Sequence, residues 1–179
     1  MCLQLPDASI NTPAIASEDI PVYRVLYSAK AYQNMLRKQL ELEWGKDLED
    51  EENSAYLNSI NSLDVERYPW VSPYYKAPIS LDEIQVSDLH YPMELFNLHV
   101  ILVGIHSVAT LEDARALVAA MVAENRLIDG SDHSNDLAIF EAVIPEGSLY
   151  YKGLFYYVGG DAGAVSYASN QIKYIKRID

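Results

Sequence analysis

The alternation of apolar and polar residues along the chain predicts β-strands near both ends of the sequence. Residues 20–27, IPVYRVLY, are rich in β-branched and aromatic side chains and predict the first strand. Residues 98–103, LHVILV, form a short apolar run that is typical of a buried strand. The same criteria predict three further strands: residues 138–144, 149–158 and 171–178.

Two segments have the composition or the period of a helix. Residues 28–48 carry helix-forming residues with one apolar side. Residues 110–127 are clearer, because apolar residues recur at helical spacing and Thr110 precedes Glu112 and Asp113 in a pattern like a capping box. We therefore predict an α+β fold: a mostly antiparallel sheet with one main packed helix, about residues 110–127.

The middle of the chain differs from its two ends. Prolines interrupt any long element between residues 54 and 94. We interpret residues 41–94 as an acidic insertion, helical or irregular. The scaffold would then be residues 1–40 and 95–179, and all 179 residues would form a single domain.

Negative charge is concentrated in this insertion. Residues 41–94 hold 13 of the 26 carboxylates and three cations, a net charge of −10, whereas the whole chain has a net charge of −13. Such an acidic balance argues against nucleic acid or an anionic membrane as a direct ligand, and it favours a basic protein partner.

Cysteine content and hydropathy indicate the cellular compartment. A single cysteine excludes an internal disulfide and a cysteine-based zinc site, and it fits a reducing compartment. No apolar run approaches 18 residues, and the chain shows no basic segment followed by an apolar core at its start. We therefore expect a cytoplasmic protein that has no membrane segment.

Metal and cofactor motifs are absent from the sequence. His90, His99 and His106 are spaced by nine and seven residues, so they form no metal-binding helical pair. The glycines at 159, 160 and 163 lack the Lys-Ser/Thr that follows a phosphate-binding loop, and they predict a flexible hairpin loop. We expect neither a metal nor a cofactor.

Several stretches together resemble a known group of proteins. The chain begins Met-Cys-Leu and contains EDIPVYRVL (18–26), SPYY (72–75), GIHSVATLEDA (104–114), EAVIPEGSLYYKG (141–153) and YASNQIKYI (167–175). It resembles small uncharacterised proteins from phages, prophages and Bacteroidetes-type genomes. The resemblance covers roughly residues 1–27 and 96–179. That group has no established activity, so the resemblance implies a mobile-element setting and no mechanism.

One set of residues allows an enzymatic reading. Arg24, His106 and Glu141 follow one another in an order similar to that of ADP-ribosyltransferases. In those enzymes the first group holds the nicotinamide ribose side, and the glutamate orients the nucleophile or stabilises an oxocarbenium-like centre. The chemistry needs a carboxylate beside a positive charge in a cleft. This alternative implies binding of NAD.

The interpretation that we prefer is based on a run of four acidic residues. Glu49, Asp50, Glu51 and Glu52 lie between Trp44 and Trp70. Aromatic residues often anchor interfaces and charges steer a partner of opposite sign, although most such runs are simply solvated. We interpret the protein as a non-enzymatic inhibitor from a phage or mobile element. It would bind a basic, nucleic-acid-handling host protein as an anti-CRISPR-type or nucleic-acid-mimic antagonist. A further alternative is a structural protein that forms homo-oligomers through its tyrosine-rich strands.

Overall fold

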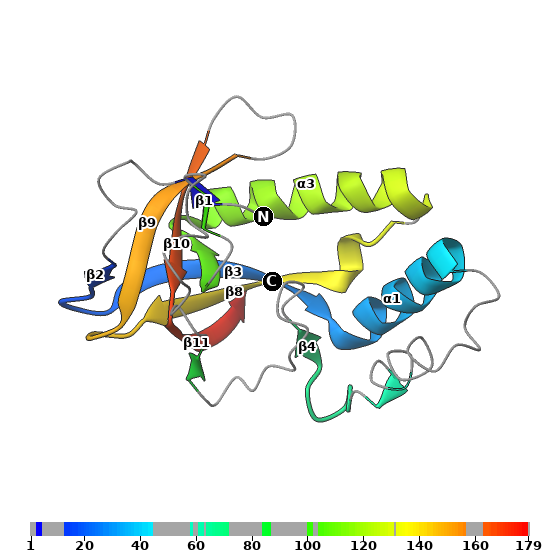
Figure 1. The fold of residues 1–179 in the computed structure, drawn as a ribbon, viewed down its shortest axis with the longest axis horizontal. Coiled ribbons are helices and arrows are strands. Elements are labelled where there is room, and N and C mark those ends of the chain that lie inside the picture. The colour runs from blue at the N-terminus through cyan, green and yellow to red at the C-terminus, as the bar shows by residue number, and fades with distance from the viewer. Residues whose placement is uncertain are drawn as a thin grey trace.

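The computed structural model of the protein describes most of the chain outside the acidic segment (Figure 1). The residues described are 3–4, 13–44, 58, 61–62, 64–71, 84–86, 100–101, 104–130, 132–156 and 163–178. The strands are β1 (Leu3–Gln4), β2 (Ala14–Ile15), β3 (Ile20–Ser28), β4 (Trp70–Val71), β5 (Gln85–Val86), β6 (Val100–Ile101), β7 (Ile105–Val108), β8 (Leu137–Ile144), β9 (Leu149–Tyr156), β10 (Gly163–Ser169) and β11 (Gln171–Ile178). The helices are α1 (Ala29–Trp44), α3 (Leu111–Asp129) and the 3-10 turn η4 (Ser134–Asp136).

These strands join in one sheet with the order β5-β11-β8-β3-β7-β10-β9-β1-β6. Strand β2 pairs with β9, and β4 pairs with β3. Every pairing among the described residues is antiparallel. In Figure 1, β9 and β10 cross the direction of β3 and β8, so the sheet is strongly bent. The prediction of an α+β fold with a mostly antiparallel sheet is confirmed.

Strand β3 lies at the centre of this arrangement. It pairs with β8 from Ile20↔Ile144 to Tyr27↔Leu137, and on its other side Tyr23 pairs with Val108 of β7. Most of its side chains are buried, because both faces of the strand are covered. This explains why its sequence is almost continuously apolar rather than alternating.

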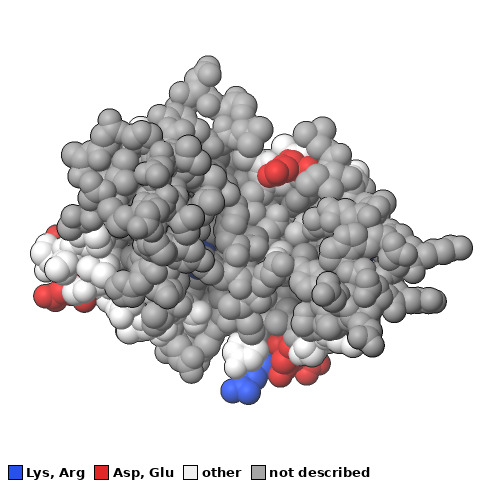
Figure 2. All heavy atoms as spheres, in the orientation of Figure 1, with Lys and Arg blue, Asp and Glu red and all other residues white. Residues whose placement is uncertain are grey.

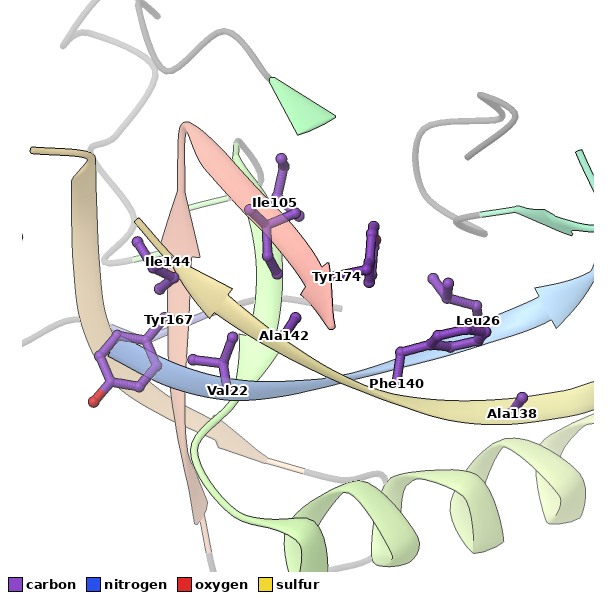
Figure 3. Packing of buried hydrophobic residues seen from close by; sticks show 10 residues of the cluster. Val22, Leu26, Ile105, Ala138, Phe140, Ala142, Ile144, Tyr167 and Tyr174 are labelled. Atoms are coloured by element: carbon purple, nitrogen blue, oxygen red, sulfur yellow. The ribbon is translucent and has the colours of Figure 1, made fainter. Parts of the chain in front are cut away.

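One face of the sheet closes around an aromatic core (Figure 3). Val22 and Leu26 of β3 pack there with Phe140 of β8. The Phe140 ring meets the Tyr174 ring edge-on, with 5.9 Å between the ring centroids. Tyr167 of β10 belongs to the same cluster, so strands far apart in the sequence share one core.

The opposite face carries both helices. Leu117 and Met121 of α3 pack against Val25 of β3, and Tyr32 of α1 lies in the same cluster. The prediction of one main packed helix is therefore wrong, since α1 is also packed on the sheet. The helix predicted within residues 28–48 is confirmed over Ala29–Trp44, but its apolar side was too weak to show that the helix would contact the core.

The prediction of a helix near residues 110–127 is confirmed by α3. Its start is capped by Thr110, whose Oγ1 accepts a hydrogen bond of 3.1 Å from the backbone N–H of Asp113. The Thr110 hydroxyl also donates to the Asp113 carboxylate at 2.6 Å. The cap thus uses the predicted residues, and it satisfies one of the N–H groups that every helix start leaves without an internal partner.

The sequence pattern missed two of the longer strands, β7 and β10. Gly104 has a φ of 93° and precedes β7, which is separate from β6. Strand β10 begins at Gly163, a glycine assigned to a flexible loop, and its small residues Ala164, Ser166 and Ala168 are buried between β7 and β9. Val165 and Tyr167 are its only β-branched or aromatic residues, so its composition is a weak signal for a strand and its neighbours in the sheet decide the conformation.

Part of the acidic segment belongs to the sheet. Strand β4 places Val71 in the helix-side core with 1% of its surface exposed, and β5 pairs with β11. Short strands from residues 41–94 thus pair with β3 and β11, and the division into a scaffold of residues 1–40 and 95–179 with an acidic insertion stays a prediction. The run from Glu49 to Glu52 lies outside the described residues. No helix in the described part of the chain is long and apolar enough to cross a membrane.

Candidate functional site

Arg24 is a charged residue inside the bent sheet. It shares a face of β3 with Val22 and Leu26, and only 5% of its surface is exposed. Its Nε donates a hydrogen bond of 2.8 Å to the main-chain oxygen of His106, and its Nη1 donates to the hydroxyl of Tyr174. These bonds cross 82 and 150 residues of sequence. The guanidinium therefore ties β3 to β7 and β11.

His106 meets Arg24 through its main chain and not through its ring. Within β7, Ile105 packs in the aromatic core that contains Phe140 (the inner core), whereas Val108 packs on the face that the helices cover (the helix side). Because side chains alternate along a strand, the His106 ring lies on the helix side. Burial lowers the pKa of His106 from 6.5 to about 4, and the charge of Arg24 also contributes. The imidazole is therefore neutral at pH 7.

The space next to this ring is small. A cavity of ≈ 20 Å³ is bordered by His106, Ser107 and Leu117 together with residues of β3. Within the described residues, Nε2 of His106 and Oγ of Ser107 are buried and have no hydrogen-bond partner. Sites for small organic molecules occupy roughly 300–1,000 Å³, so this cavity has no room for a nicotinamide ring or a ribose.

Glu141 does not join Arg24. It pairs with Tyr23, the residue next to Arg24, so its side chain leaves the opposite face of the sheet. Strand β3 also separates Glu141 from β7. Glu141 pairs with Tyr23 and Tyr23 pairs with Val108, so two strand spacings place Glu141 about 10 Å from Val108, and His106 lies two residues further along β7. Its carboxylate is instead 3.3 Å from Nζ of Lys176.

The fold therefore brings together only two of the three residues in the ADP-ribosyltransferase-like set. Arg24 and His106 are in contact, but Arg24 donates its hydrogen bonds to the protein and Glu141 lies elsewhere. A carboxylate beside a positive charge in an open cleft is what the chemistry requires. These three residues do not form that arrangement. Among the residues that the structure describes, no group of three or more His, Cys, Asp or Glu side chains could hold a metal ion.

Trp70 is the one predicted anchor whose side chain the structure describes. It is partly buried, and its ring meets Phe140 edge-on at 5.4 Å between centroids. The guanidinium carbon of Arg177 lies 4.9 Å from its centroid. Trp70 thus fastens β4 to the core, which leaves only part of the ring for a partner. Trp44 ends α1, and the acidic run from 49 to 52 lies outside the described residues.

Two contacts close the excursion of residues 29–69, which contains the acidic run. Ala29 starts α1 and its N–H donates to the Pro69 carbonyl at 2.8 Å, so the chain leaves β3 and returns to the same place. Further out, Nε of Arg37 donates to Oδ1 of Asn61 at 2.9 Å. Helix α1 extends away from the sheet (Figure 1). The excursion of residues 29–69 is therefore closed at its base.

Comparison with known proteins assigns no family to the chain. No protein-family model, curated protein or solved structure matches the chain.

Proposed function

We propose that the protein is a non-enzymatic binding protein whose acidic segment engages a basic protein partner. The observation that carries this proposal is the net charge of −10 in residues 41–94, within a chain of net charge −13. A surplus of this size attracts a basic partner and raises its rate of association.

The geometry supports the proposal because it gives the segment a firm base. The contact of Ala29 with Pro69 joins the two ends of the excursion that contains the acidic run, and the contact of Arg37 with Asn61 joins its two sides further out. Elsewhere the acidic side chains of described residues are dispersed, as Figure 2 shows for the face in view. The segment is thus the part of the molecule in which negative charge is most concentrated.

A nucleic-acid-handling host protein is the partner class that we favour, with the protein acting as an inhibitor from a phage or mobile element. Channels for DNA and RNA are lined with Lys and Arg, so a carboxylate array can compete for the same cations. Glu49, Asp50, Glu51 and Glu52 would supply the charges in this scheme, with Trp44 and the exposed part of Trp70 as anchors.

The test is a capture experiment with two variants of equal charge. In the first variant Glu49, Asp50, Glu51 and Glu52 are changed to Lys. The matched control changes four exposed glutamates of the scaffold to Lys: Glu18, Glu112, Glu124 and Glu146. Each immobilised protein is incubated with nuclease-treated bacterial lysate at low and high salt, and bound proteins are quantified by mass spectrometry.

We expect the native protein and the control to retain a basic nucleic-acid-binding protein at low salt only, and the acidic-run variant to lose it by about tenfold or more, equivalent to 1.4 kcal/mol. Equal capture by all three proteins would contradict the proposal. Equal loss in both variants would show that total charge and not the acidic run determines binding.

A further inference from the structure

A groove with positive lining lies between α1 and the η4 turn, on a protein that is strongly acidic overall. Its volume is ≈ 540 Å³, which falls in the range of sites for small molecules. Among the described lining residues, five come from α1 and two from the turn: Lys30, Ala31, Asn34, Arg37, Lys38, His133 and Asp136. Among the described residues, the lining contains none of the Arg24 cluster.

The cations of the groove come from one face of α1. Lys30, Asn34 and Lys38 are spaced by four residues, and this spacing aligns side chains along a helix. Lys30 and Lys38 are exposed. Arg37 is partly buried, and its bond to Asn61 orients the guanidinium. The helix thus presents two ammonium groups beside one oriented planar guanidinium.

The facing wall is a fixed turn. The Asp136 carboxylate accepts a hydrogen bond from Nδ1 of His133 at 2.8 Å, and the backbone N–H of Asp136 donates to the His133 carbonyl at 3.0 Å. The N–H of Ser134 is bonded to Oδ1 of Asp132 at 3.0 Å. Because the Asp136 carboxylate is bonded to His133, it counters the three cations less than an isolated carboxylate would.

Three cations around a groove of this size favour a compact oxyanion. A guanidinium binds two oxygens of a phosphate at once, and ammonium groups add point charges. A long polyanion is disfavoured, because DNA or RNA extending beyond the groove would meet the carboxylates that give the chain its net charge of −13. A small phosphate ester keeps its charge inside the groove and avoids that repulsion.

We propose that the groove formed by Lys30, Arg37 and Lys38 of α1 with His133 of the η4 turn binds a phosphate-bearing small molecule of nucleotide size. The phosphate lies against the helix, and the ≈ 540 Å³ volume accommodates the organic group attached to it. Asn34 and His133 supply hydrogen bonds at the two walls.

The proposal is tested by titrating the full-length protein with AMP, inorganic phosphate and adenosine. Binding is measured by calorimetry and located by backbone amide NMR shifts. The test variant is Lys30→Gln with Lys38→Gln. The matched control is Lys173→Gln with Lys176→Gln, which removes the same charge from exposed positions of β11. Both pairs are exposed, so both variants are expected to fold.

We expect AMP to bind with shifts at Ala31, Asn34 and His133, inorganic phosphate to compete with it, and adenosine to bind far more weakly. The groove variant should lose about tenfold or more in affinity, as expected for removing charge-assisted hydrogen bonds, and the control should lose less than about twofold.

The proposal is overturned if AMP and phosphate fail to bind at roughly 10 mM, far above the range expected for a specific site. It is also overturned if both variants lose affinity equally. A third titration uses the variant in which Glu49, Asp50, Glu51 and Glu52 are Lys. Binding of AMP to that variant alone would assign the groove to the protein's own acidic run and would likewise overturn the proposal.

Discussion

Arg24 shows how a single polar residue can organise a strand that is otherwise apolar. A buried guanidinium is tolerated only where its N–H groups have acceptors, and here they are the His106 carbonyl and the Tyr174 hydroxyl. The acceptors come from β7 and β11, on either side of the central β3–β8 pair. Arg24 therefore acts as a cross-brace, which is a structural role that its position in the sequence does not reveal.

Replacing this brace should destabilise the fold. In Arg24→Met the acceptors on His106 and Tyr174 lose their donor while remaining buried, so we expect the free energy of unfolding to fall by about 3 kcal/mol. Urea unfolding followed by circular dichroism measures it. Arg115→Met, at an exposed position of α3, is the control and should change stability by less than about 0.5 kcal/mol. A stability of Arg24→Met equal to that of the control would exclude the brace.

His106 should make the protein sensitive to mild acid. Its pKa is about 4 in the folded protein and 6.5 in the unfolded chain, so the unfolded state binds more protons between these values. Above pH 6.5 the ring is neutral in both states and does not change the free energy of unfolding with pH. That free energy decreases as the pH falls from 6.5 to 4. We expect this residue alone to account for a loss of about 3 kcal/mol between pH 7 and pH 4.

The measurement compares urea unfolding of the native protein and of His106→Gln at pH 7, 5.5 and 4. The difference in unfolding free energy between the two proteins should shift in favour of the variant as the pH falls. A difference that is the same at all three pH values would mean that the ring is accessible to protons in the folded state.

At the scale of elements, the short strand β4 is what attaches the acidic segment to the scaffold. Its two residues pair with Tyr27 and Ser28 at the end of β3. Trp70 lies against Phe140 in the inner core, while Val71 is buried on the helix side. Adjacent residues of a strand point to opposite faces, so two residues are enough to contact both cores.

Truncating Val71 tests this attachment. Val71→Ala removes buried methyl groups and should lower the free energy of unfolding by about 2 kcal/mol. Ile15→Ala is the control, since Ile15 in β2 is 68% exposed and should cost little. Thermal and urea unfolding of the two variants measure the difference. If Val71→Ala were as stable as Ile15→Ala, the acidic segment would not be anchored through β4.

At the scale of the whole molecule, charge opposes folding. A net charge of −13 on 179 residues repels itself when the chain is compact, and salt screens that repulsion. Raising NaCl from about 20 mM to about 500 mM shortens the screening length well below the size of the protein. We therefore expect the melting temperature to rise by about 2–4 °C, which corresponds to roughly 1 kcal/mol for a domain of this length.

Differential scanning calorimetry in the two salt concentrations measures this shift. The variant with Lys at positions 49–52 serves as the comparison, because it carries less net charge and should gain less from salt. If the native protein and this variant gained equally, self-repulsion within the acidic segment would not be the cause.

The strongest elements could be predicted from local pattern. The strands at residues 20–27, 138–144 and 171–178 are confirmed, and that at 149–158 is confirmed as far as Tyr156, because β-branched and aromatic residues concentrate there between turn signals. The helix at residues 110–127 is confirmed because its apolar period and its cap agree. Strand β10 was missed, since its small side chains fit a strand only when neighbours cover it.

The candidate site could be predicted only as a list of residue types. Arg24 lies in β3, and His106 and Glu141 lie in its two neighbours β7 and β8. The alternation of side chains nevertheless places Arg24 and Glu141 on opposite faces of the sheet. Which face each residue occupies depends on the register between strands. That register is set by contacts between segments far apart in the sequence.

The amino-acid sequence by itself determined where the main strands and helices form and where negative charge accumulates, because both depend on neighbouring residues. Tertiary structure alone decided that α1 packs on the sheet, that Arg24 braces β7 and β11, and that the lysines of α1 face His133 across a groove. These outcomes arise from pairings over long sequence separations, and chain geometry rather than residue type determines them.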